Sequence, residues 1–102
     1  MNTDYAIIRK NWNGIEIEIR WNPDYLAFEG RPDMAHLEIE SIRPARAPLP
    51  MTETGYRSHF IQPNEVERFG GVEAYVEAWM VELSGTAAWR QTDAAARQFA
   101  LF

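Results

Sequence analysis

The sequence predicts an α+β domain, in which an antiparallel four-stranded sheet from the N-terminal half is covered by two or three C-terminal helices. The first sixty residues contain stretches in which single apolar and polar residues alternate. This period of two is typical of strands with one buried face. Further along the chain, the apolar residues recur every three or four positions, as in amphipathic helices. The chain has 102 residues, of which 46% are hydrophobic, and this suits one domain with one core.

The first two strands are expected to form a hairpin. Residues 15–21 read IEIEIRW, so that Ile and Trp alternate with Glu and Arg. The dipeptide Asn13-Gly14 stands directly before them, and both of its residues tolerate the positive φ that tight hairpin turns require. Residues 4–22 are therefore predicted to be an antiparallel hairpin.

Two further strands are expected before the helices. Residues 22–33 contain two Pro-Asp pairs and a Gly, which indicates a turn, a short apolar segment and a second turn. Residues 35–42 alternate again and predict the third strand. Three prolines between residues 43 and 51 then rule out a central strand there. Gly55 is expected to turn the chain into a fourth strand, which would end near Ile61.

The clearest helical pattern lies in the second half of the chain. Its apolar positions are Val72, Tyr75, Val76, Trp79, Met80 and Leu83. Trp79 stands at the middle of this stripe, so it is expected to be almost fully buried against Ile17 or Ile19 of the hairpin.

Shorter signals mark the neighbouring helices. Asn64 and Glu67 have the spacing of a capping box, and Gly70-Gly71 would end the helix that they begin. Thr86 is expected to cap a last helix over residues 87–98, which Asp93 and Arg97 would support as an i, i+4 ion pair.

The composition limits the classes of function. The absence of cysteine excludes disulfides, thiolate metal sites and a cysteine nucleophile. Neither a signal peptide nor an apolar run of the ~18 residues that cross a bilayer is visible, so a soluble cytoplasmic protein is expected. The net charge of −5 argues against direct binding of nucleic acid, which needs clustered Lys and Arg.

The acidic residues gather in one part of the chain. Residues 64–83 contain five Glu, and Arg68 is the only basic residue among them. This run is either a solvated helix face or an acidic surface that imitates DNA. In the second case the chain would be a mobile-element inhibitor of a host defence or DNA-binding protein.

Few residues suggest catalysis. His36, Glu38 and His59 could meet if their strands pair, and two His with one carboxylate can bind a divalent metal. The spacing is nonspecific, however, so neither a metal nor another cofactor is expected. Ser58 has no evident base, because its neighbours in a strand would point to the opposite face. The chain is therefore predicted not to be an enzyme.

Residues 48–60 read PLPMTETGYRSHF, with Met51 at an aliphatic position. This segment resembles one found in small, uncharacterised proteins of proteobacterial genomes, plasmids and phages. The resemblance implies a family associated with mobile elements, but no activity. The residues themselves predict a loop and a strand, in which Thr and Glu side chains satisfy a tight turn.

The last five residues are Gln98-Phe99-Ala100-Leu101-Phe102. They resemble the motif Gln-Leu-Ser/Asp-Leu-Phe, which tethers bacterial proteins to the DNA polymerase III β sliding clamp. Gln98, Leu101 and Phe102 match this motif, whereas Phe99 replaces its usual Leu. The resemblance implies a folded domain over residues 1–97 and a clamp-binding tail that would recruit other clamp partners or block them.

A second interpretation of the same residues remains open. Phe99 follows Thr92, Ala95 and Ala96 at helical spacing. Phe99 and Phe102 could therefore extend the apolar side of the last helix into the core. In that case truncation of the tail would destabilise the fold instead of removing a binding site.

Overall fold

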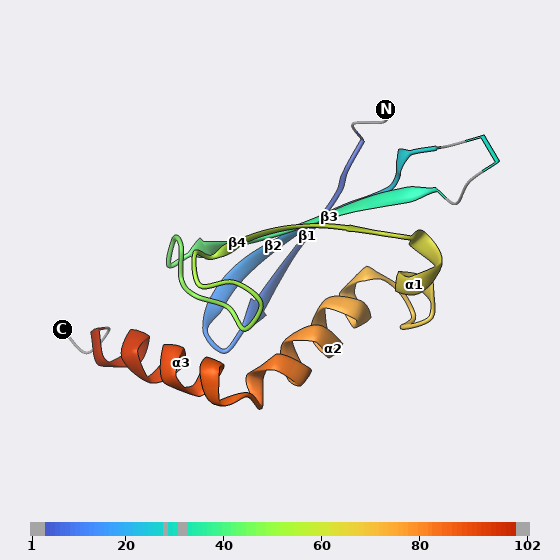
Figure 1. The fold of residues 1–102 in the computed structure, drawn as a ribbon. Coiled ribbons are helices and arrows are strands. Elements are labelled where there is room, and N and C mark those ends of the chain that lie inside the picture. The colour runs from blue at the N-terminus through green and yellow to red at the C-terminus, as the bar shows by residue number, and fades with distance from the viewer. Residues whose placement is uncertain (1–3, 28, 31–32, 100–102) are drawn as a thin grey trace.

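The computed structural model describes residues 4–27, 29–30 and 33–99, and it confirms the predicted α+β fold (Figure 1). Its strands are β1 (Ala6–Trp12), β2 (Ile15–Leu26), β3 (Met34–Arg43) and β4 (Tyr56–Ile61). Its helices are α1 (Pro63–Glu67), α2 (Val72–Ser84) and α3 (Ala87–Phe99). The strand order is β1-β2-β3-β4 with every pair antiparallel, and the helices lie on one side of the sheet.

The predicted hairpin is confirmed at its turn. Asn13 and Gly14 have φ values of 50° and 84°, the left-handed conformation that this dipeptide favours. The second strand is longer than expected, however, because β2 runs to Leu26 instead of ending in a turn near residue 22. Its pairing with β3 shifts register between Asn22 and Leu26, and Pro23, which has no N–H to donate, lies in this irregular stretch.

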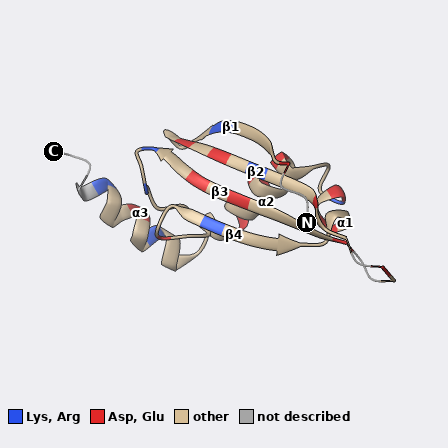
Figure 2. Ribbon diagram, turned by 90° about the horizontal axis from the view of Figure 1, so that it is seen from above, with Lys and Arg blue, Asp and Glu red and all other residues tan. Residues whose placement is uncertain are grey.

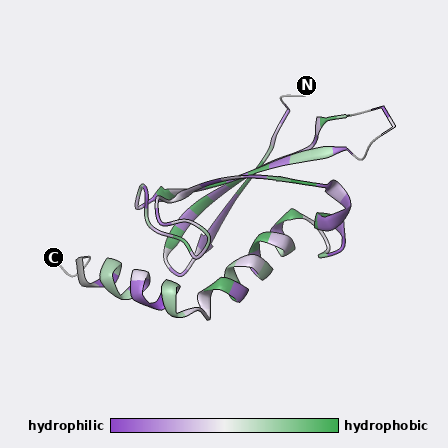
Figure 3. Ribbon diagram, in the orientation of Figure 1, coloured by the Kyte–Doolittle hydropathy of each residue, from purple (hydrophilic) through white to green (hydrophobic). Residues whose placement is uncertain are grey.

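The core lies between the sheet and α2. Ile17 and Ile19 of β2 and Leu37 and Ile39 of β3 have no exposed surface. Helix α2 covers them, as the stripe of apolar residues predicted, and Figure 3 shows hydrophobic and hydrophilic residues mixed along this helix. The buried members of the stripe are Val76 and Met80, and its other members pack at the margin of the core.

Two local predictions were wrong. Trp79 is only partly buried, because its ring lies beside β4, with its centroid 4.9 Å from that of His59. The capping box at Asn64 does not form: α1 begins at Pro63 after Gln62, and no side chain caps it. Proline is favoured at the first helical position because its fixed φ suits a helix, so the helix begins two residues earlier than the capping signal indicated.

Candidate protein-binding site

The face of the sheet that the helices leave open carries a network of charges, and Figure 2 views the molecule from this side. The pairing of β2 with β3 places Glu18 opposite Glu40 and Arg20 opposite Glu38. Two carboxylates directly opposite each other repel, so this register needs a cation between the strands. Arg20 supplies that cation.

Arg20 joins three carboxylates at once. Its guanidinium donates to Glu18 at 2.5 Å and to Glu40 at 2.9 Å, and its Nε lies 3.5 Å from Glu38. The side chain of Arg20 is only 20% exposed, so these contacts are shielded more than ordinary surface ion pairs. The hydrogen bond from Arg20 is the main reason that the pKa of Glu18 lies below its usual value.

The pKa of Glu38 is also lowered. Burial alone would raise it, but hydrogen bonds from Tyr56 and Arg20 stabilise the ionised carboxylate and outweigh the burial. Glu38 is therefore an ionised group that can only accept hydrogen bonds.

A chain of hydrogen bonds leads from Glu38 across the sheet. Tyr56 donates to Glu38, which leaves the phenol oxygen of Tyr56 to accept from Ser58. The Ser58 Oγ is hydrogen-bonded to the His36 Nε2 at 2.7 Å, and the His36 Nδ1 is hydrogen-bonded to the Tyr5 hydroxyl at 2.5 Å.

This contact between His36 and Ser58 was missed in the sequence. The chain neighbours of Ser58 point to the opposite face, but the register of β3 with β4 pairs His36 with Phe60 and Glu38 with Ser58. That register brings the two side chains together on one face.

The three candidate metal ligands do not converge. His36 and Glu38 lie on the open face, but His59 is paired with Leu37 and points to the helices. Within the part of the chain that the structure describes, no group of three or more His, Asp or Glu side chains could hold a metal ion.

Helix α3 has a different surrounding from α2. Its predicted cap is confirmed, because the Thr86 Oγ1 accepts from the backbone N–H of Trp89 at 3.1 Å. Trp89 is its one buried residue in the described part of the helix, and its ring lies 5.6 Å from that of Trp12. Figures 1 and 2 show α3 extending beyond the end of the sheet.

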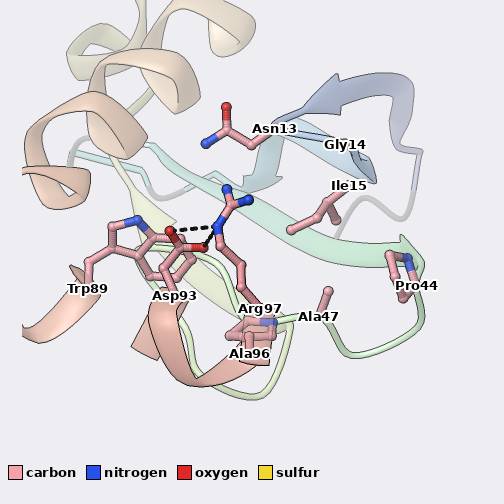
Figure 4. A pocket seen from close by; sticks show the side chains of 10 residues that line it. Asn13, Gly14, Ile15, Pro44, Ala47, Trp89, Asp93, Ala96 and Arg97 are labelled. Carbon is pink, nitrogen blue, oxygen red and sulfur yellow. Dashed lines mark hydrogen bonds and ion pairs between the residues drawn. The ribbon is translucent and has the colours of Figure 1, made fainter. Parts of the chain in front are cut away.

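A cleft of about 450 Å³ runs along α3 (Figure 4). The hairpin turn at Gly14 and the loop at Ala47 form one wall, and Trp89 and Ala96 lie on the helix side. The predicted ion pair is confirmed at its rim, where the Arg97 Nε donates to the Asp93 carboxylate at 3.1 Å. Although Trp89 anchors α3, part of the helix thus borders open space.

The proposed tail lies at the end of this helix. The backbone of Gln98 and Phe99 belongs to α3, whereas Leu101 and Phe102 lie outside the described residues. The packing of the tail side chains also lies outside what the structure describes.

The comparisons with known proteins give one family. The model of the KlcB third domain matches residues 5–98. The chain belongs to this family. KlcB is linked to plasmids, in keeping with the expected association with mobile elements. No curated protein and no solved structure matches the chain.

The match to the KlcB third domain includes the PLPMTETGYRSHF segment, which the structure shows as a pinned loop followed by β4. The Thr52 Oγ1 donates to the carbonyl of Tyr56 at 2.8 Å and accepts from the N–H of Thr54 at 3.3 Å. Gly55 has φ 78°, and a Cβ there would lie 2.7 Å from the backbone of Arg46. The predicted turn is thus confirmed for its threonines and its glycine. The contacts described here stabilise the conformation of this loop.

The acidic run of residues 64–83 is distributed over α1, α2 and the segment between them. Glu73 and Glu77 are more than half exposed, and Lys10 of β1 forms ion pairs with both. Glu65 lies 3.6 Å from Arg68. The interpretation of this run as a DNA-like inhibitory surface stays a prediction. No helix in the described ranges is long and apolar enough to cross a membrane.

Proposed function

We propose that this KlcB third-domain chain is a non-catalytic binding module, which docks on the bacterial β sliding clamp through Gln98, Phe99, Leu101 and Phe102. The observation that supports this proposal is the position of α3. The helix extends beyond the sheet. Three residues in its last described turns are exposed, namely Ala94, Ala95 and Arg97. A peptide that continues from there starts away from the core.

The chemistry of the tail suits a short peptide ligand. Leu101 and Phe102 would be the apolar anchors, because a few buried side chains carry most of the binding energy of such peptides. The Gln98 side chain has two donors and one acceptor, so it would fix the register at the rim of the clamp pocket. Docking would then either recruit the domain to replicating DNA or block other clamp partners.

The affinity should be moderate. Phe99 stands where the clamp motif has Leu, and a larger side chain in a preformed pocket costs packing energy. We expect a dissociation constant in the micromolar range, about −8 kcal/mol.

Calorimetry with purified clamp tests the proposal. The intact chain should bind, and the double variant Leu101→Ala/Phe102→Ala should lose most of that binding. Phe60→Ala is the matched control, because Phe60 is 52% exposed on the distant face of the sheet and should leave the affinity unchanged. Absence of binding by the intact chain at ~100 μM, a hundred times weaker than the micromolar expectation, would contradict the proposal.

A further inference from the structure

A second pocket, of about 360 Å³, lies on the helix side of the sheet, between β4, α1 and α2. Its volume is near the lower end of ligand pockets, so it suits a small group and not an extended ligand. Its lining includes His59, Glu65, Phe69, Tyr75, Trp79 and Glu82.

The walls of this pocket are aromatic rings at several angles. Phe69 meets Tyr75 edge to face, with centroids 5.2 Å apart and an angle of 84° between the planes. Tyr75 and Trp79 are one turn apart on α2, with centroids separated by 6.1 Å and planes inclined by 55°. The three rings thus border the pocket at different angles, and the face of an aromatic ring carries the partial negative charge that attracts a cation.

The polar groups at this pocket favour positive charge. Glu65 and Glu82 both line it, and Glu65 is half-buried. The pKa of Tyr75 is raised, first by burial and then by the charge of Glu65, so the tyrosine stays a neutral phenol beside that carboxylate. The pKa of His59 is lowered by burial and by Arg57, so the imidazole adds no positive charge near neutral pH.

One cation already uses this aromatic cluster. The guanidinium carbon of Arg57 lies 5.6 Å from the centroid of the Trp79 ring, within the range of a cation–π contact. Arg68 lies 3.6 Å from Glu65, and neither Arg57 nor Arg68 lines the pocket. Glu65 and Glu82 are thus the carboxylates in the lining itself, and they leave the immediate wall of the pocket acidic.

We propose that this pocket binds a small organic cation through an ammonium or methylated ammonium head, seated between Phe69, Tyr75 and Trp79 with Glu65 and Glu82 at its rim. Aromatic cages that recognise such heads work in this way, because the ring faces attract the charge and the methyl groups fill the apolar space. The head could belong to a free molecule such as choline or to a methylated lysine side chain.

Choline and its uncharged tert-butyl analogue are the first probes. Both have the same shape and differ in charge, so a cation site separates them. Titration of the full chain, followed by the indole N–H resonance of Trp79, should show saturable binding of choline at millimolar concentration and at least about fivefold weaker binding of the analogue. Equal binding of the two would overturn the proposal, and so would no response to either.

Three variants locate the site. Phe69→Leu removes a half-exposed wall, and Glu82→Gln removes a carboxylate without changing its shape; each should weaken choline binding about threefold or more. Glu67→Gln is the matched control, because Glu67 is an exposed acid on α1 that does not line this pocket. An equal loss in the Glu67 and Glu82 variants would show that general charge, and not this pocket, attracts the cation.

A second series identifies the source of the head. Trimethyllysine amide that binds more tightly than choline supports a modified side chain of a partner protein, whereas tighter binding of choline supports a free molecule. Weak and equal binding of both, with no dependence on Phe69, contradicts the cage. None of these measurements involves the clamp, so the cage and the clamp proposal fail or hold separately.

Discussion

Helices α2 and α3 have the same length of 13 residues, yet they are held to the domain in different ways. Helix α2 contributes Val76 and Met80 to the main core, with four further side chains packed around them. Among the side chains that the structure describes, α3 adds none to that cluster, and its buried residue Trp89 packs against Trp12. Helix α2 therefore completes the main core, whereas the described part of α3 is held to the domain through Trp89.

The largest loss of stability is expected from a substitution on the core side of α2. Val76→Ala removes two methyl groups from a side chain that is 1% exposed, and should lower the free energy of unfolding by about 2–3 kcal/mol. Val81→Ala is the same chemical change one and a half turns later, where the side chain is 71% exposed, and should cost less than about 0.5 kcal/mol. Urea denaturation of both variants checks the difference; equal losses would show that α2 packs by another face.

A smaller loss is expected when α3 loses its anchor. Trp89→Ala should lower the free energy of unfolding by about 1–2 kcal/mol, less than a usual core tryptophan, because α3 can undock while the sheet stays folded. Hydrogen exchange should then rise in α3 and remain slow in β2 and β3. A uniform rise over the whole chain would mean that the two helices are equally part of the core.

Acid should weaken the unit of sheet and α2 before it affects α3. The folded-state pKa values of Glu18 and Glu38 lie below their usual values, so their contribution is present above the unfolded pKa of ~4.3 and is lost as the pH falls through the folded values. Thermal melts between pH 6 and pH 3 should therefore show a falling melting temperature, because this is about the range in which carboxylates titrate. The variant Glu38→Gln should make the melting temperature depend less on pH. An unchanged slope of melting temperature against pH would contradict the role of the Arg20 network.

The smallest effect concerns the surface of α3. Arg97→Ala removes an ion pair with Asp93 in which the arginine is 67% exposed, and should change the free energy of unfolding by less than about 0.5 kcal/mol. Denaturation measured at low and high salt tests this, because an exposed pair of this kind is screened. A loss above about 1 kcal/mol would mean that Arg97 anchors α3 as Trp89 does.

Much of this fold could be predicted from the sequence, because the alternation in β2 and the apolar stripe of α2 are local patterns that follow directly from strand and helix geometry. The contacts of the site residues were harder to predict from the sequence, because they depend on the register between strands. The bond from His36 to Ser58 and the position of His59 on the opposite face follow from the pairing of β3 with β4, which no local pattern specifies. Trp79 was misplaced for a related reason: the stripe shows which side of α2 faces the sheet, but not which residue lies at its centre.

The central claim is that α3 presents a binding peptide that the fold leaves accessible. The most direct test compares the dissociation constant of the whole chain for the clamp with that of a synthetic peptide of residues 98–102. An accessible tail predicts two micromolar values within about threefold of each other, because no free energy is then spent on releasing the tail. A peptide that binds while the whole chain does not would contradict the claim, and would support the interpretation in which Phe99 and Phe102 pack into the core.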